Sequence, residues 1–95
     1  MTTINSASDG QLDTAIFEGD EARAMLQHPV LLKALDEIER DATEAMINAL
    51  DPAEREAKWY TTRAIKELKK QLLKTANAGA VAKDTKVKRA RNVQK

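Results

Sequence analysis

Apolar residues recur every three or four positions through the middle of the chain, which is the spacing of a helix with one buried face. Between residues 29 and 50 they advance by 4, 3, 4, 3 and 4 positions, at Leu31, Leu35, Ile38, Ala42, Ala45 and Ala49. Residues 52–78 repeat this spacing at Ala57, Thr61, Ala64 or Ile65, Leu68, Leu72 and Ala76. These rows predict two long helices, 29–50 and 52–78, that pack along an apolar seam.

The junction between these helices carries the strongest local signal in the chain. Asp51 can cap the second helix, Pro52 suits a first helical turn, and Glu54 occupies the capping-box position that reaches back to the cap. A junction this short makes the two helices antiparallel. Gly79 is predicted to end the second helix, because glycine readily adopts the left-handed conformation that follows many helix ends.

A short helix is predicted ahead of the hairpin, over residues 21–27, with Asp20 as its candidate N-cap. It should stop at His28, because the following Pro29 disfavours helical geometry at the residue before it. The expected fold is therefore all-α: an antiparallel helical hairpin with a short preceding helix and extended or mobile termini.

Charge separates the two ends of the chain from the middle. Residues 1–20 hold four acidic and no basic side chains, whereas residues 80–95 hold six basic side chains and one acidic one. Neither end has enough large apolar residues to offset the entropy of ordering it. We therefore expect an acidic N-terminal arm (1–20), a helical hairpin domain (21–79) and a basic C-terminal tail (80–95).

The two long helices also carry opposite net charge. Residues 30–51 hold six acidic and two basic side chains, and residues 52–79 hold seven basic and three acidic ones. Opposite flanking charges favour the antiparallel pairing, by about 0 to 1 kcal/mol for each exposed pair. The Ala-rich seam makes a thin core, so we expect self-association or docking on a larger protein.

The residue types needed for several kinds of site are missing from the 95-residue sequence. It has no cysteine and one histidine, His28, which rules out a disulfide, a thiolate metal site and a metal site with two histidines within the chain. No glycine-rich phosphate-binding motif occurs, and the acidic side chains of residues 29–50 spread over a solvated helix face. We therefore expect no catalytic, metal or cofactor site and no enzyme activity. No apolar stretch approaches the ~20 residues of a membrane span, so no membrane partner is expected.

Six residues are candidates for binding a partner. Trp59 and Tyr60 are adjacent on the basic helix, and their side chains point about 100° apart. Both can hardly enter one seam, so one of them is available to a partner. Packing in the core is the alternative role for these two residues. The basic tail contains a cluster of four cationic side chains: Lys86, Lys88, Arg89 and Arg91. This cluster could neutralise nucleic-acid phosphates, or it could dock on an acidic protein surface such as the acidic arm of a neighbouring copy. A tail that only aids solubility is the other interpretation.

One set of residues resembles a family of small bacteriophage proteins. It covers roughly residues 21–82 and consists of Met25-Leu26-Gln27-His28-Pro29, Leu35, Ile38, Arg55, Trp59, Ala64-Ile65, Leu68, Leu72 and Gly79. Members of this family are short helical hairpins of uncharacterised function, often encoded among genes for head and virion assembly. The resemblance implies a phage origin and a location in the virion or the host cytoplasm, and it brings no catalytic residues.

Three functions are compatible with these features. The first is a non-enzymatic component of the virion, located in the head, the connector or the particle interior. It would form a homo-oligomer or dock on a larger phage assembly, and its contacts would be made by helix packing and by the charged termini. The second is a small DNA-binding or regulatory protein that uses the basic tail. The third is an assembly chaperone or scaffold that binds a capsid or terminase component and is absent from the finished virion.

Overall fold

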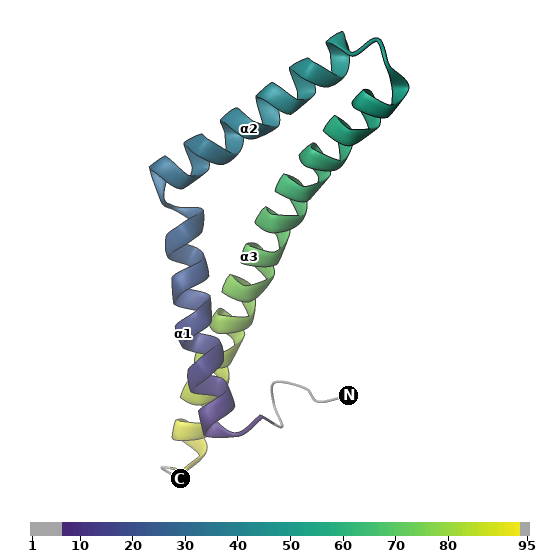
Figure 1. Cartoon of the computed structure of the whole chain (residues 1–95). Helices are drawn as coiled ribbons and strands as arrows, with labels where there is room; N and C mark the ends of the chain where they lie inside the picture. The colour runs from purple at the N-terminus through teal and green to yellow at the C-terminus, as the bar shows by residue number, and fades with distance from the viewer. Residues whose placement is uncertain (1–6, 94–95) are drawn as a thin grey trace. The chain divides into compact units, whose positions relative to one another are not determined.

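The computed structural model describes residues 7–93 and shows three α-helices, with no strand, in that range (Figure 1). They are α1 (Asp9–Leu26), α2 (Pro29–Asn48) and α3 (Pro52–Val93), which confirms the all-α class. The chain divides into two compact units. Unit 1 joins the described residues up to Met25 with those from Leu72 onward, and unit 2 comprises Leu26–Gln71.

Unit 2 is a helical hairpin made of α2 and the first part of α3. His28 is the N-cap of α2: its backbone is extended, and its Nδ1 accepts a hydrogen bond from the Leu31 amide at 3.2 Å. Pro29 takes the first helical position. Asp51 begins α3 as expected, since its Oδ1 accepts a hydrogen bond from the Ala53 amide at 3.2 Å. The single histidine of the chain thus has a structural role.

The α2 side of the hairpin seam follows the predicted row. Its buried residues are Leu35, Ala42 and Ala49, and Leu31 and Ala45 in the same row are half-buried. Ile38 is the exception, because 46% of its area stays exposed. α2 therefore meets α3 with the expected face, although the helix ends at Asn48 rather than at residue 50.

The predicted row of α3 is covered only in part. The buried and half-buried residues of α3 in unit 2 are Lys58, Thr61, Thr62, Ile65 and Lys69, which include the predicted Thr61 and Ile65. Leu72 and Ala76 of the predicted row are covered in unit 1, whereas Ala57, Ala64 and Leu68 are exposed. Lys69 can occupy the seam because its aliphatic stem is partly buried while its ammonium reaches Asp36 at 3.1 Å and Glu39 at 3.7 Å. Hydropathy alone favoured Leu68, so the prediction was wrong at this position, where the neighbouring Lys69 is covered instead.

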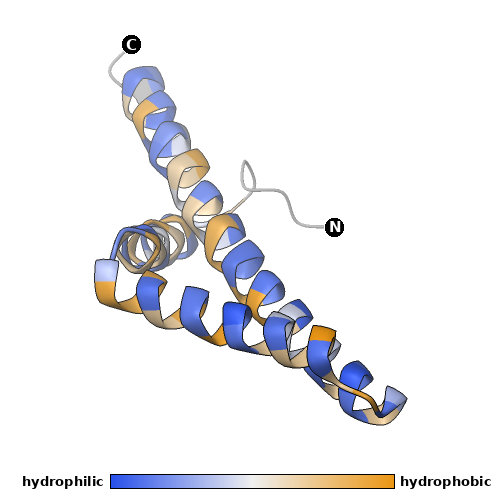
Figure 2. Ribbon diagram, turned by 90° about the horizontal axis from the view of Figure 1, so that it is seen from above, coloured by the Kyte–Doolittle hydropathy of each residue, from blue (hydrophilic) through white to orange (hydrophobic). Residues whose placement is uncertain are grey.

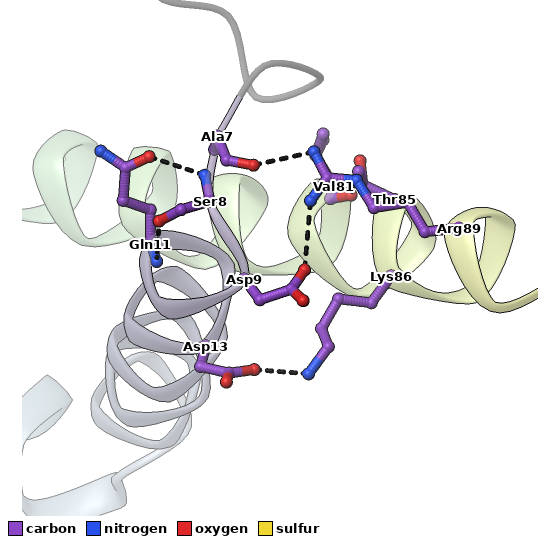
Figure 3. A network of polar contacts seen from close by, with 9 residues as sticks. All are labelled: Ala7, Ser8, Asp9, Gln11, Asp13, Val81, Thr85, Lys86 and Arg89. Atoms are coloured by element: carbon purple, nitrogen blue, oxygen red, sulfur yellow. Dashed lines mark hydrogen bonds and ion pairs between the residues drawn. The ribbon is translucent and has the colours of Figure 1, made fainter. Parts of the chain in front are cut away.

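Unit 1 pairs α1 with the C-terminal part of α3. α1 begins at Asp9, so the prediction of a short helix starting at residue 21 after a mobile arm is wrong for residues 9–20. A capping box starts this helix: the Gln11 amide donates to Ser8 Oγ at 3.1 Å, and the Ser8 amide donates to Gln11 Oε1 at 2.8 Å (Figure 3). Residues 1–6 of the predicted arm lie outside the described range.

α3 continues through Gly79 to Val93, so the predicted helix end and the predicted extended tail are wrong for residues 80–93. Residues 94–95 lie outside the described range. Gly79 does not have the positive φ of a glycine that ends a helix. Its role is to allow α1 and α3 to pack closely. A Cβ built on Gly19 of α1 would lie 2.6 Å from the Gly79 Cα, and one built on Gly79 would lie 2.7 Å from the Gly19 Cα. The missing side chains let the two backbones touch.

Small residues make up most of the buried set in unit 1. Among residues 7–93, Leu12 is the one large side chain that is fully buried, and it lies with Ala7 and Ala82 in a small apolar cluster. The other buried apolar residues of this unit are Ala22 and Ala76. Figure 2 shows how apolar and hydrophilic residues alternate along each helix. Close backbone approach therefore supplies the packing contacts that larger side chains supply in most cores.

Replacing Gly19 by alanine is expected to destabilise unit 1, because the new methyl group would overlap the Gly79 backbone. Overpacking of this kind costs about 1 to 3 kcal/mol. That cost exceeds the ~1 kcal/mol by which alanine is favoured over glycine inside a helix. Thermal unfolding followed by circular dichroism should therefore show a lower Tm.

Gly10→Ala is the matched control, since its Cβ would meet only Ser8 Oγ, at 4.0 Å. This variant should unfold at the wild-type Tm or above it. A Tm of Gly19→Ala that equals or exceeds the wild-type value would contradict the close crossing of α1 and α3.

Candidate interaction surfaces

Unit 1 brings acidic residues of the N-terminal arm and basic residues of the tail together within one chain. Three ion pairs join α1 to α3, and we call them the clasp: Asp9–Arg89 at 3.2 Å, Asp13–Lys86 at 2.5 Å and Asp20–Lys83 at 2.7 Å. Their order runs in opposite directions along the two helices, as antiparallel packing requires. Figure 3 shows the first two pairs, together with the Arg89 guanidinium donating to the Ala7 carbonyl at 2.8 Å.

The clasp shifts the ionisation of its own members. The hydrogen bond from Lys83 lowers the pKa of Asp20, an effect that desolvation opposes and the positive charges of Lys83 and Arg23 reinforce. The hydrogen bond to Asp13, helped by the charge of that carboxylate, raises the pKa of Lys86. Both shifts favour the charged forms at neutral pH. Because these side chains are largely exposed, salt screens the pairs, and their main effect is to select which helix faces meet.

The clasp contains two of the four tail cations that the sequence singled out. Lys86 and Arg89 belong to it. Lys88 pairs instead with Asp84, one turn earlier on α3, at 2.9 Å, and Arg91 is exposed in the last turn of the helix. The structure thus places residues 83–89 of the tail against residues 9–20 of the acidic arm of the same chain. Phosphate binding by the tail would have to compete with the clasp carboxylates.

Trp59 and Tyr60 lie on the surface of unit 2, near the start of α3. Their rings meet edge to face with centroids 5.1 Å apart, and the Arg63 guanidinium lies 5.6 Å from the centroid of the Trp59 ring. Trp59 is 45% exposed and Tyr60 57%, so neither fills the seam. The two rings and Arg63 form an aromatic and cationic surface, whose role in binding a partner stays a prediction.

The predicted α3 residues that are not covered belong to a set of apolar residues on one side of the hairpin. We call it the open face: Val30, Ala34 and Ile38 on α2, with Ala57, Thr61, Ala64 and Leu68 on α3. Each member except Ile38 immediately precedes a seam residue, and in two antiparallel right-handed helices such positions lie on the same side of the pair. Asp41 and Glu44 also precede seam residues, so the α2 part of this side becomes acidic after Ile38. All are exposed except the half-buried Thr61, and Leu68 exposes 44% of its area. Sequence reasoning missed this face because it placed the α3 members in the seam.

Two open hollows accompany these surfaces. The hollow in unit 1 measures about 220 Å³ and has largely apolar walls, which include Phe17, Met25 and Leu72. The hollow in unit 2 measures about 670 Å³, and most of the residues that line it are polar or charged, among them Asp36 and Lys69. Within residues 7–93 no three potential metal-ligating side chains gather in one place. None of the helices in that range combines the length and the apolar character that a membrane span needs.

Comparisons of the chain with protein-family models, with curated proteins and with solved structures find no match. What the chain can do therefore has to be inferred from the chemistry of its surfaces. The charged side chains of the clasp already pair with each other. The surface around Trp59 and the open face each present several exposed apolar groups in unit 2, where Ile47 and Leu50 near the turn of the hairpin are exposed as well.

Removing the Lys83 ammonium is expected to raise the pKa of Asp20 towards its ordinary value, about 3.9. In the wild type the folded pKa lies below the unfolded one. The stability that the pair contributes is therefore present above the ordinary aspartate value and is lost as the pH falls through the folded value. NMR titration of the Asp20 carboxyl carbon in the wild type and in Lys83→Gln measures the shift.

Lys88→Gln is the matched control, because Lys88 pairs with Asp84 on its own helix and not with α1. It removes the same charge and should leave the titration of Asp20 unchanged. If the Asp20 carboxyl titrated with the same midpoint in the wild type and in Lys83→Gln, the ion pair between Asp20 and Lys83 would be refuted.

Proposed function

We propose that this chain is a non-enzymatic structural protein of a bacteriophage virion, a minor component of the head, the connector or the particle interior, that acts by packing its helices against other proteins. The observation that carries the proposal is the open face of unit 2, an exposed apolar surface on a layer of two helices. The bacteriophage setting is supported by the resemblance of residues 21–82 alone.

A two-helix layer is stabilised when its second side is covered. Full burial of a leucine or isoleucine side chain stabilises a protein by about 1.5 to 3 kcal/mol relative to leaving it exposed. Ile38 and Leu68 each leave close to half of their area in water. The alanines around them, Ala34 and Ala64, would let another helix approach closely. Such a surface is typical of a subunit whose neighbours complete its hydrophobic core.

DNA binding through the basic tail is the main alternative. Three tail cations already face carboxylates in the clasp, so a phosphate group would gain little from them: Lys83, Lys86 and Arg89. A better set for phosphates follows Trp59 along α3, where Arg63, Lys66 and Lys70 form no ion pair with any described residue. An assembly chaperone or scaffold, the third function, would use the same open face as a virion component.

Mass spectrometry of purified particles tests the proposal. The chain should be found in mature virions at a constant copy number after a high-salt wash that removes loosely attached protein. An early non-structural protein of the same phage is the control and should be absent. Detection only in assembly intermediates would support the chaperone or scaffold instead, and absence from both fractions would contradict the proposal.

A mobility-shift experiment with duplex DNA separates the structural function from DNA binding. At about 0.15 M salt, where exposed charges farther apart than ~8 Å are largely screened, we expect no shift. A salt-sensitive shift would argue for DNA binding instead. Loss of that shift in the triple variant Arg63→Gln, Lys66→Gln and Lys70→Gln, with retention in Lys88→Gln and Arg91→Gln, would place the DNA-binding site in unit 2 rather than in the tail.

A further inference from the structure

We infer that a stripe along α3 of unit 2 binds single-stranded nucleic acid, with three cations contacting phosphates and one exposed tryptophan stacking on a base. The stripe consists of Trp59, Arg63, Lys66 and Lys70. This inference goes beyond the proposed function and does not rest on it, because the stripe and the open face lie on opposite sides of the hairpin.

The four side chains of the stripe share one face of α3. They are spaced by 4, 3 and 4 residues, which places them in one row along a helix. Each directly follows a covered residue of the seam, whereas the α3 members of the open face directly precede the same seam residues: Lys58, Thr62, Ile65 and Lys69. The stripe therefore points to the other side of the hairpin. All four side chains are exposed, and Trp59 exposes 45% of its area.

The three cations of the stripe form no ion pair with any described residue. On α2, Asp36 and Glu39 lie on this side of the hairpin, and the Lys69 ammonium holds both carboxylates, at 3.1 and 3.7 Å. Arg40 lines the same hollow and adds a further positive charge. Glu67 is the only acidic residue in the α3 segment that carries the stripe. Cations therefore outnumber carboxylates on this side, and an anion that binds the stripe displaces no existing ion pair.

Trp59 stands at one end of the stripe and is held by two neighbours. The Arg63 guanidinium lies over its ring, 5.6 Å from the centroid, and the Tyr60 ring meets it edge to face at 5.1 Å. These contacts orient the indole and leave nearly half of it exposed. An exposed indole beside a guanidinium offers the two contacts that a nucleotide needs, a flat surface for the base and a positive charge for the adjoining phosphate.

A single strand fits these contacts better than a duplex or an acidic protein does. Its bases are free to stack on Trp59, whereas a duplex would first have to unpair and unstack a base. An acidic peptide segment could pair with the cations, but its carboxylates offer the indole no flat apolar group. From Trp59 to Lys70 the stripe rises about 16 Å along the helix, enough for a few nucleotides of an extended strand. Such a site tolerates many sequences, because every base has a face that can stack.

Titration of the protein with oligothymidylate, followed by tryptophan fluorescence, tests the inference directly. Trp59 is the only tryptophan of the chain, so the signal reports this position alone. Stacking on a thymine should quench the fluorescence. The affinity should fall about 20-fold between about 0.05 and 0.2 M salt, because three phosphate contacts to a single strand give a slope of about −2 in a plot of log K against log salt. Oligouridylate is compared side by side, and binding of either strand in this way supports the inference.

Charge variants locate the site, with the anisotropy of a fluorescein-labelled oligothymidylate as the signal. A triple variant that lacks the cations of the stripe should bind about tenfold more weakly, or weaker still: Arg63→Gln, Lys66→Gln and Lys70→Gln. The matched control removes the same charge at exposed positions outside the stripe and should bind within about twofold of the wild type: Lys33→Gln, Lys88→Gln and Arg91→Gln. Circular dichroism should show wild-type helix content in both variants.

Variants of Trp59 separate stacking from charge. Trp59→Leu keeps an apolar side chain without an aromatic ring, so it should weaken binding about fivefold or more and leave the salt dependence unchanged. Trp59→Phe keeps a ring and should retain most of the affinity. Three competitors complete the test: a strand of abasic nucleotides and polyglutamate, which carry negative charge without bases, and duplex DNA, whose bases are paired. Each should compete about fivefold or more weakly than unlabelled oligothymidylate.

Several results would overturn the inference. A wild type that binds neither strand at low salt excludes the site. A control triple variant that binds as weakly as the stripe variant places binding elsewhere. Equal competition by abasic strands or polyglutamate indicates a surface for any polyanion, acidic proteins included, and equal competition by duplex DNA excludes the preference for single strands. None of these results depends on whether the protein is found in particles, so failure of the inference is distinguishable from failure of the proposed function.

Discussion

Each helix of this chain is stable only when one of its faces is buried against another helix. In both units the helix that buries this face is α3. Isolated helices are marginal in water, so packing has to supply most of their stability. α3 buries Thr62 and Ile65 against α2 in unit 2, and it buries Gly79 and Ala82 in the unit that contains α1. The ion pairs are secondary to this packing, because their members are mostly exposed and salt weakens them.

The parts of the fold that could be predicted are those set by local chemistry. Asp51 and Pro52 define a helix start whatever surrounds them, and His28 and Pro29 do the same for α2. The Ser8–Gln11 capping box was an equally local signal, but the polar composition of the first 20 residues concealed it. Residues 9–20 are helical and packed on α3, and composition alone does not reveal a partner 60 or more residues away in the chain.

The parts that could not be predicted are those decided by packing between helices. Glycine commonly ends a helix, yet Gly79 is needed inside α3 because Gly19 faces it. Hydropathy ranks leucine above lysine, yet Lys69 occupies the seam because carboxylates on α2 receive its ammonium. The tail cations were identified as binding residues from the sequence. That two of them, Lys86 and Arg89, meet carboxylates of their own chain became clear only from the structure.

The clasp joins residues that are 63 to 80 positions apart in the chain, a long separation for a helical protein, in which most contacts are local. During synthesis α1 leaves the ribosome long before the part of α3 that covers it. Leu12 and Gly19 therefore stay exposed to solvent until the part of α3 that contains Gly79 and Ala82 has been made, so unit 1 can pack only after the hairpin of unit 2 has been synthesised.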